Sequence, residues 1–505
     1  MRQLFTLLLV AATAISVRAT VYNVPIIVTV NGVSSEQTGT ISIEENDGKY
    51  DLTMQNFMLQ SEDGPMGVGN VALRDITAYQ DGDALLLLAS DEVTITDGDD
   101  PSVPFWMASI LPPVNVNLRA KIVGDQLRCC LDIDLTEALG QVIKVGIGSG
   151  YQMPNPSFES WHTSTGNYVE PNAWHSFESA TGSLVSMAGH HIEKSADAHT
   201  GDAAARIYST SIFGIVANGT MTTGRMNAGS MSASNTQNNA YLDMSKTDVD
   251  GNGDPFYVPL CSRPDSVAVW MKFKQGKANS AHPYATISAV ITDGTYYQDP
   301  EDQTYTNVVA KAKNNQIATT DGQWVRITAP FVYTGNSVTP KAVLITISTN
   351  ADAGQGSNGD EVLVDDIEFV YNTNVTDLKV KGQSVADFSP EKSEYEMELN
   401  EEITTADIEA VMEGGETTHI VETVEVEGDY YVCTFIVINA DMSASKTYIV
   451  KVKSTATAIT MHPETTTRGA SDTYYTLGGR QVKALKQGNV YIRRQADGTT
   501  TKTRR

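Results

Sequence analysis

Glu159 and Asp365 are the two carboxylates of this chain whose sequence surroundings most suggest a chemical role. Glu159 follows an Asn-Pro turn and an aromatic residue. Asp365 lies in residues 362–370, whose alternation predicts a β-strand. On that strand Asp365 is expected to share the apolar face with Leu363, Ile367 and Phe369. A carboxylate on an apolar face is costly, so we expect a cation or hydrogen-bond donors to meet it.

A second group of oxygen-bearing residues matches the first half of an EF-hand calcium loop. Asp248, Asp250 and Asn252 alternate, and a glycine stands at the sharp turn. Pro259 then occupies the position where the loop needs a bidentate carboxylate, so the match is incomplete. Because turns rich in Asp, Asn and Gly are common without a metal, the sequence leaves both interpretations open.

Aromatic side chains near carboxylates and amides are the candidates for sugar binding. Aromatic faces pack against the C–H surfaces of a sugar ring, and polar groups bind its hydroxyls. Tyr296 and Tyr297 lie in a segment rich in Gly, Asp and Pro, where exposure is expected. The predicted ligand-binding residues are Trp161, Trp174, Tyr296, Tyr297 and Asp299. For each aromatic residue, burial in a core is the competing interpretation.

Catalysis has little support in the sequence. It contains no HExxH motif, and no Gly-x-Ser-x-Gly elbow, phosphate-binding loop or dinucleotide fingerprint in a suitable setting. Paired carboxylates for glycoside hydrolysis are always available in so acidic a chain, so their presence decides nothing. The sequence therefore favours binding over catalysis, with no catalytic residue assigned.

The elements that must position these residues are short β-strands. The chain has 505 residues, more than one domain usually holds. Alternating segments broken by Gly, Asn, Asp and Pro recur throughout, which predicts an all-β, multidomain protein. Residues 22–149 read as strands with short connections and predict an up-and-down antiparallel barrel. Its interior is expected to be packed with side chains, or to hold one ligand.

The amino terminus predicts a signal peptide over residues 1–19. Arg2 supplies the positive charge, residues 4–15 the apolar run, and residues 17–19 a cleavage site of small-residue type. The apolar run is too short to span a bilayer. The protein is therefore predicted to be exported, extracellular or on the outer-membrane cell surface, and not membrane-spanning.

The net charge limits the classes of partner, and the cysteine content limits the kind of scaffold. The net charge is −26, from 35 basic and 61 acidic residues, which argues against nucleic acid and anionic membranes. Ca²⁺ and neutral glycans remain compatible with this charge. Four cysteines in so long a chain do not indicate a disulfide scaffold, and we expect small buried hydrophobes.

The middle of the chain, residues 151–372, resembles the carbohydrate-metabolism domain of secreted bacterial proteins, a galactose-binding-like jelly roll. The order of its landmarks carries the resemblance: the Asn-Pro-Ser-Phe-Glu-Ser-Trp segment at 155–161, Pro-Asn-Ala-Trp at 171–174, Asp-Gly-Gln-Trp at 321–324, and the closing strand. The resemblance implies a carbohydrate partner and a structural Ca²⁺. Its ligands would be Glu159, Asp365 and a carbonyl oxygen of the turn at Thr200.

The flanking segments resemble other families. Residues 20–150 resemble the calycin-like β-barrel domain by length and strand order. Residues 373–454 resemble a cadherin-like or immunoglobulin-like sandwich, which implies a spacer. Residues 455–505 are similar to the C-terminal sorting domain of proteins exported by the type IX pathway, which implies contact with secretion machinery.

Together these patterns predict an exported protein that binds glycans through a calcium-stabilised jelly roll and does not cleave them. Two alternatives stay open. One is a glycan-active hydrolase or lyase that uses loop carboxylates. The other is a structural or adhesion protein in which every domain is a spacer.

Overall fold

The structure is a computed structural model. It describes residues 19–30, 33–59, 65–136, 140–163, 168–212, 214–245, 253–373, 375–412, 418–454, 473–476, 481–482, 490–494 and 500–504. The predicted signal peptide lies outside these residues except for Ala19. No helix in the described part of the chain is long and apolar enough to cross a membrane.

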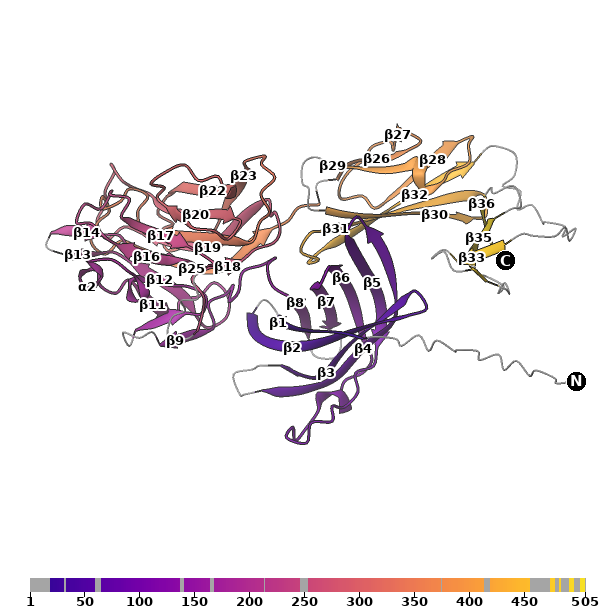
Figure 1. Cartoon of the computed structure of the whole chain (residues 1–505), viewed down its shortest axis with the longest axis horizontal. Helices are drawn as coiled ribbons and strands as arrows, with labels where there is room; N and C mark the ends of the chain where they lie inside the picture. Colours follow the sequence, from indigo (N-terminus) through magenta and orange to yellow (C-terminus); the bar gives the residue numbers. More distant parts are fainter. Residues whose placement is uncertain are drawn as a thin grey trace, which may run out of the picture.

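The first domain is a closed eight-stranded antiparallel barrel, as predicted (Figure 1). Pairing of the first strand with the eighth closes it. The inward side chains form one continuous hydrophobic cluster that includes Ile26, Leu52 and Leu118, so the barrel is packed. Its strands are β1 (Thr20–Val30), β2 (Val33–Asn46), β3 (Lys49–Leu59), β4 (Met66–Asp81), β5 (Ala84–Val93), β6 (Val114–Val123), β7 (Gln126–Leu135) and β8 (Gln141–Ile147).

The middle domain is one long antiparallel sheet folded over into a sandwich. The fold occurs at β23 (Val325–Tyr333), whose first half pairs with β19 and whose second half pairs with β22. Apolar side chains from the two halves meet in a single core. The other strands, in sheet order, are β11 (Ile192–Ser195), β12 (Ala204–Tyr208), β25 (Glu361–Val370) and β19 (Ser266–Lys274) on one side, then β22 (Val308–Ile317), β20 (Ala285–Thr292), β24 (Ala342–Ser348) and β15 (Thr220–Thr222) on the other. The short strand β18 (Val258–Pro259) also pairs with β24.

A third layer covers the outer face of β20 and β24. It contains a small sheet of β16 (Arg225–Ala228), β17 (Asn238–Leu242) and β21 (Tyr297–Asp299), and a hairpin of β13 (Thr210–Ile212) and β14 (Ile215–Ala217). Apolar side chains of the small sheet pack on Val290 and Leu344 in a second cluster. Both faces of β20 and β24 are therefore largely buried, which is unusual for strands of an antiparallel sandwich. Shorter elements at this end of the domain are β9 (Trp161–Thr163), β10 (Val169–Pro171), η2 (Phe177–Ser179) and α2 (Val185–Ala188).

The third domain packs a three-stranded sheet on a four-stranded sheet. The first sheet contains β26 (Val375–Val380), β27 (Gln383–Ser384) and β29 (Ile408–Met412). The second contains β28 (Glu394–Leu399), β30 (Thr418–Glu427), β31 (Tyr430–Asn439) and β32 (Ser445–Ser454), with β28 parallel to β32. After it, β33 (Thr473–Thr476), β34 (Gln481–Val482), β35 (Val490–Arg494) and β36 (Thr500–Arg504) form a small separate sheet. A sorting role for that last segment stays a prediction.

The turn between β31 and β32, residues 440–444, joins the third domain to the barrel (Figure 1). Three cationic side chains on the outer face of β6 and β7 donate to its carbonyl oxygens. Arg119 donates to Met442 and Ser443, Lys121 to Ala440, and Arg128 to Asp441. The middle domain reaches the same turn through Gln152, whose amide bonds the Asp441 carboxylate and the Phe369 carbonyl.

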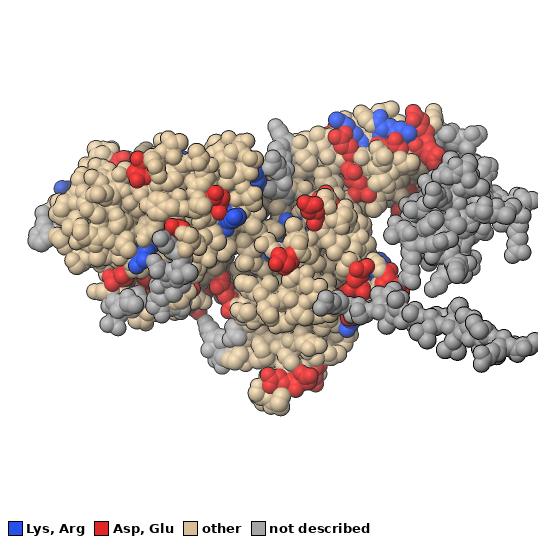
Figure 2. Space-filling model, viewed as in Figure 1, with Lys and Arg blue, Asp and Glu red and all other residues tan. Residues whose placement is uncertain are grey.

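Three of the four cysteines, Cys129, Cys130 and Cys433, are buried as expected, whereas Cys261 is exposed, and all four are free. Acidic side chains are spread over all three domains on the face shown in Figure 2, with Lys and Arg interspersed.

Candidate functional site

The strand that carries Asp365 contains a β-bulge, and the bulge changes which of its residues face the core. The pairing with β19 shifts between Ala268 and Trp270, and Asp366 adopts a left-handed backbone with φ 44°. Before the bulge Val362 and Val364 point into the core, and after it Ile367 and Phe369 do. The prediction that Leu363, Asp365, Ile367 and Phe369 share one face is therefore wrong, because an extra residue reverses the alternation.

Asp365 consequently lies on the outer face of its sheet, opposite Trp270. It is nonetheless buried, because the turn at residues 199–200 covers it. The backbone N–H groups of His199 and Thr200 donate to its Oδ2 at 2.7 and 3.2 Å, and that of Asp366 to its Oδ1 at 2.8 Å. The His199 ring stacks on Trp270 and bonds Asp366. Burial, and then the charge of Asp366, raise the pKa of Asp365 to about 7.

Glu159 holds the other end of the same turn. Its Oε1 accepts the backbone N–H groups of Asp202 and Ala203 at 3.0 and 3.2 Å, and burial raises its pKa. The structure thus places Glu159 and Asp365 at the two ends of one turn, residues 199–203, which includes Thr200. Ile367 also donates its N–H to the Pro156 carbonyl, which ties the opening segment to the closing strand.

Hydrogen-bond donors already surround Asp365 and its neighbour Asp366. Thr200 presents its N–H to Asp365 and its hydroxyl to Asp366. Among the described residues, no group of three or more His, Cys, Asp or Glu side chains is arranged to hold a metal. Hydrogen bonds therefore account for the buried carboxylate, and calcium stays a prediction to be tested.

Removing Ca²⁺ with a chelator distinguishes a turn held by hydrogen bonds from one held by a calcium ion. If hydrogen bonds alone hold the turn, the melting temperature of the full chain will be the same in EDTA as in excess Ca²⁺. A fall in melting temperature with EDTA that Ca²⁺ restores would instead support the predicted clamp, since a ligand that binds only the folded state stabilises it. Differential scanning calorimetry at fixed ionic strength makes the measurement, with Mg²⁺ as the control cation.

The EF-hand-like residues Asp248, Asp250 and Asn252 lie outside the described residues, so that site also stays a prediction. The next carboxylate, Asp254, is described and accepts the backbone N–H of Ala173.

The predicted sugar-binding aromatics divide into core and surface residues. Trp174 is fully buried in the sandwich core, and Tyr297 is buried in the cluster beneath the small sheet. Neither offers a face to a ligand, so for these two the core interpretation holds. Trp161 is half-buried and donates its indole N–H to the Phe158 carbonyl. Tyr296 is 40% exposed and lies beside Tyr241 and Tyr305.

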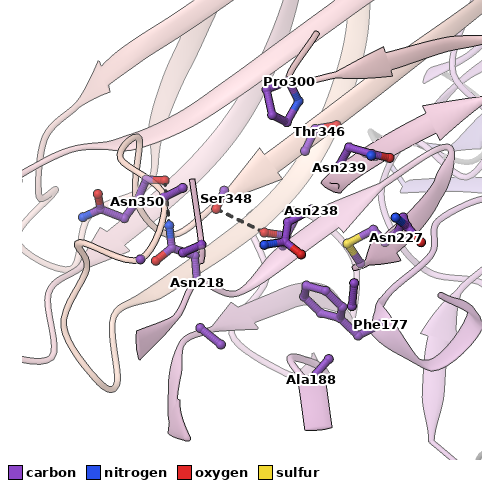
Figure 3. A pocket seen from close by; sticks show the side chains of 18 of the residues that line it. Phe177, Ala188, Asn218, Asn227, Asn238, Asn239, Pro300, Thr346, Ser348 and Asn350 are labelled. Atoms are coloured by element: carbon purple, nitrogen blue, oxygen red, sulfur yellow. Dashed lines mark hydrogen bonds between the residues drawn. The ribbon is translucent and has the colours of Figure 1, made fainter. Parts of the chain in front are cut away.

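A pocket of about 370 Å³ lies between the sandwich and its third layer. Asp299, the last of the five predicted sugar-binding residues, lies at the end of β21 and lines this pocket. In Figure 3, Phe177 and Ala188 lie on the side opposite Pro300 and Thr346, and asparagine side chains stand around the space between them. The other predicted binding residues, Trp161, Trp174, Tyr296 and Tyr297, do not line it.

The floor of the pocket is a patch of hydroxyl groups on the outer face of β20 and β24. Thr286, Thr346 and Ser348 line the pocket, and Thr286 pairs with Ser348 across the two strands. Their strand neighbours Ile287 and Ile347 point the opposite way, into the core. A period-two row of Thr and Ser on each strand was visible in the sequence, but only the third layer makes that row part of a pocket.

The asparagines of the wall keep the pocket in shape. Asn238 accepts the N–H groups of Gly229 and Ser230 and donates to the carbonyls of Ser230 and Ser232. Asn218 donates its amide to the carbonyls of Asn350 and Asp352, which fixes the loop on the far side. A pocket preformed in this way lowers the ordering cost of binding.

Three side-chain oxygens of residues that line the pocket have no hydrogen-bond partner among the described residues. They are Asn218 Oδ1, Asn239 Oδ1 and Thr286 Oγ1, and all three are buried. The amide orientations are set by their nitrogens, since Asn218 and Asn239 donate Nδ2 to backbone carbonyls. Buried polar atoms without partners are rare, and these three belong to residues that line one pocket.

Charge is nearly absent from the pocket. Of its lining residues, all within the described part of the chain, Asp299 and Lys313 are the charged ones. Ser288 donates to Asp299 Oδ2 at 2.5 Å, which holds that carboxylate in place. Glycoside hydrolysis by the usual mechanism needs two carboxylates across the scissile bond, whereas this lining supplies one.

Comparison with solved structures gives distant similarities. One is to a protein from Bacteroides thetaiotaomicron whose assignment as a glycoside hydrolase is provisional, at 14% identity and TM-score 0.33, covering 71% of this chain and 98% of that chain. Another is to a bifunctional GH43-CE protein from Bacteroides eggerthii, at 10% identity and TM-score 0.17, covering 72% of this chain and 57% of that chain. With TM-scores this low, neither similarity bears on the function. No curated protein matches the chain. Residues 19–146 match the family model of the calycin-like β-barrel domain, so the first domain of this chain is a calycin-like barrel.

Proposed function

We propose that this protein binds a neutral carbohydrate, without cleaving it, in the pocket between the sandwich and its third layer. The observation that carries the proposal is the lining of the pocket, where hydroxyl and amide side chains such as Thr346, Ser348 and Asn238 stand beside apolar ones. A ligand with several hydroxyl groups and an apolar face matches such a lining, and sugars have both. The near absence of charge supports a neutral ligand.

The hydroxyl floor supports the same ligand class. A hydroxyl both donates and accepts, so Thr346 and Ser348 can pair with sugar hydroxyls in either sense. Residues of the three elements β20, β24 and β17 contribute to the lining, and their backbones are held by sheet pairing. The sugar would therefore meet polar groups on rigid strands, which favours specific binding over loose contact.

Thr286→Val tests the proposal with little risk to the fold. The change removes a buried hydroxyl that bonds nothing among the described residues and keeps the shape of the side chain, so stability should stay the same or rise slightly. The affinity for the bound glycan should fall about fivefold, the value of one lost hydrogen bond. A neutral-glycan array on the full chain identifies the ligand, and titration calorimetry then compares the proteins.

Thr328→Val is the matched control, because Thr328 is exposed on β23 and does not line the pocket. It should leave the affinity unchanged. If the folded wild-type protein binds no glycan on the array, the proposal is overturned. Equal affinity of wild type and Thr286→Val for a glycan that does bind would place that glycan elsewhere.

A further inference from the structure

The side of the pocket that faces the hydroxyl floor is apolar, and part of it is exposed. Two of its residues, Ile215 and Met231, are 43% and 53% exposed. They are two of the fourteen large hydrophobic side chains that are exposed in the described part of the chain. The large apolar side chains of the lining include Phe177, Leu184, Met187, Ile215, Met226 and Met231.

This wall is poorly suited to the face of a plain sugar ring. Ring faces pack best on flat aromatic surfaces, and Phe177 is the single aromatic residue among the described lining residues. Methionine and branched aliphatic side chains instead surround small apolar groups, because thioethers are flexible and polarisable. The wall therefore has the chemistry to receive a methyl group carried by the sugar.

We infer that the sugar bound here is a neutral N-acetylhexosamine, with its acetamido methyl group against Ile215 and Met231. An acetamido group combines in one substituent a polar part and an apolar part, as the lining of the pocket does. Its N–H and C=O can pair with amide and hydroxyl groups of the lining, and its methyl group covers exposed apolar surface. It adds no charge, in agreement with the lining. This inference rests on the proposed function and names the ligand within it.

The test compares acetylated sugars with their unacetylated counterparts on the full chain. The probes are the N-acetylglucosamine and N-acetylgalactosamine trisaccharides, the matching glucose and galactose trisaccharides, and the de-N-acetylated glucosamine trisaccharide. At least one acetylated probe should bind about tenfold more tightly than its counterparts, the discrimination that one small apolar group gives in an apolar pocket. Saturation-transfer NMR should show the strongest transfer to the acetamido methyl protons.

Variants of Ile215 and Met231 test the proposed methyl contact separately from sugar binding by the rest of the pocket. Ile215→Ser and Met231→Ser change exposed residues and should leave the melting temperature unchanged, while the preference for acetylated sugars falls to near unity. Val332→Ser, at a residue 72% exposed on β23 and outside the pocket, is the matched control and should keep the preference.

The outcomes distinguish this inference from the proposed function. If acetylated and unacetylated probes bind equally, and Thr286→Val weakens both, the acetamido inference is overturned while glycan binding in the pocket stands. If no probe binds and a neutral-glycan array is silent, both fail. If Ile215→Ser and Met231→Ser both keep the preference for acetylated sugars, the proposed methyl contact is also overturned.

Discussion

The Asp365→Ala protein should lose about 3 kcal/mol of its free energy of unfolding, because three backbone N–H groups would be left without an acceptor. These are the N–H groups of His199, Thr200 and Asp366, which converge on a fully buried carboxylate. Releasing them also loosens the turn at residues 199–203, whose other end Glu159 holds. Calorimetry of the full chain should show the transition of the middle domain moving to lower temperature.

Asp366→Asn is the matched control for this prediction. Asp366 is half-buried, and asparagine tolerates its left-handed backbone, so the change removes one charge without adding strain. Its effect should be well below that of Asp365→Ala. An Asp365→Ala protein as stable as the wild type would show that solvent reaches the turn and satisfies the freed N–H groups.

The raised pKa of Asp365 predicts that the stability of the folded protein falls as the pH rises. Burial, followed by the charge of Asp366, raises the pKa of Asp365 from 3.8 to about 7 in the folded protein. The folded state therefore binds a proton that the unfolded state has lost between these values. The stabilisation from this extra bound proton is complete below pH 3.8 and is lost as the pH rises through about 7. Measured against Asp365→Asn, the wild-type protein should accordingly lose stability across this interval.

The Arg128→Met protein should also be less stable by about 3 kcal/mol, with the effect at the junction of the domains. Arg128 is buried, and its guanidinium donates to the carbonyls of Asp441 and Ile147. Methionine keeps much of the apolar stem but leaves both carbonyls, and the nearby Asp441 carboxylate, without that cation. The third domain should then separate from the barrel more readily, so limited proteolysis should cut near the turn at 440–444 sooner.

Arg74→Met serves as the control on the same barrel. Arg74 pairs with Asp51 at the surface, where its side chain is 58% exposed, so its loss should change stability by less than about 1 kcal/mol. Equal proteolysis of Arg128→Met and wild type would show that Arg119, Lys121 and the apolar contacts hold the junction without Arg128.

Local alternation was enough to predict the class of fold. A strand with one buried face leaves a period of two in its sequence, and short turns between such strands favour antiparallel neighbours. The barrel therefore followed from residues 22–149, and the likeness of its strand order to a calycin-like barrel is confirmed by the family match. The acidic balance likewise predicts that nucleic acid is a poor partner, which stays a prediction.

The candidate site depended on contacts between distant segments, which alternation does not report. The same period of two misassigned Asp365, because a bulge beside Asp366 reversed the faces of its strand. Trp174 and Tyr297 have sequence contexts as open as that of Tyr296, yet packing buries the first two and leaves the third half-exposed. Thr286 and Ser348 line a pocket only because a small sheet folds over them, and two of its strands, β16 and β17, lie more than forty residues before Thr286 in the sequence. The sequence by itself thus determined which strands form and which barrel they close, since those depend on neighbouring residues. Tertiary structure decided which polar groups lack partners, since that depends on everything packed around them.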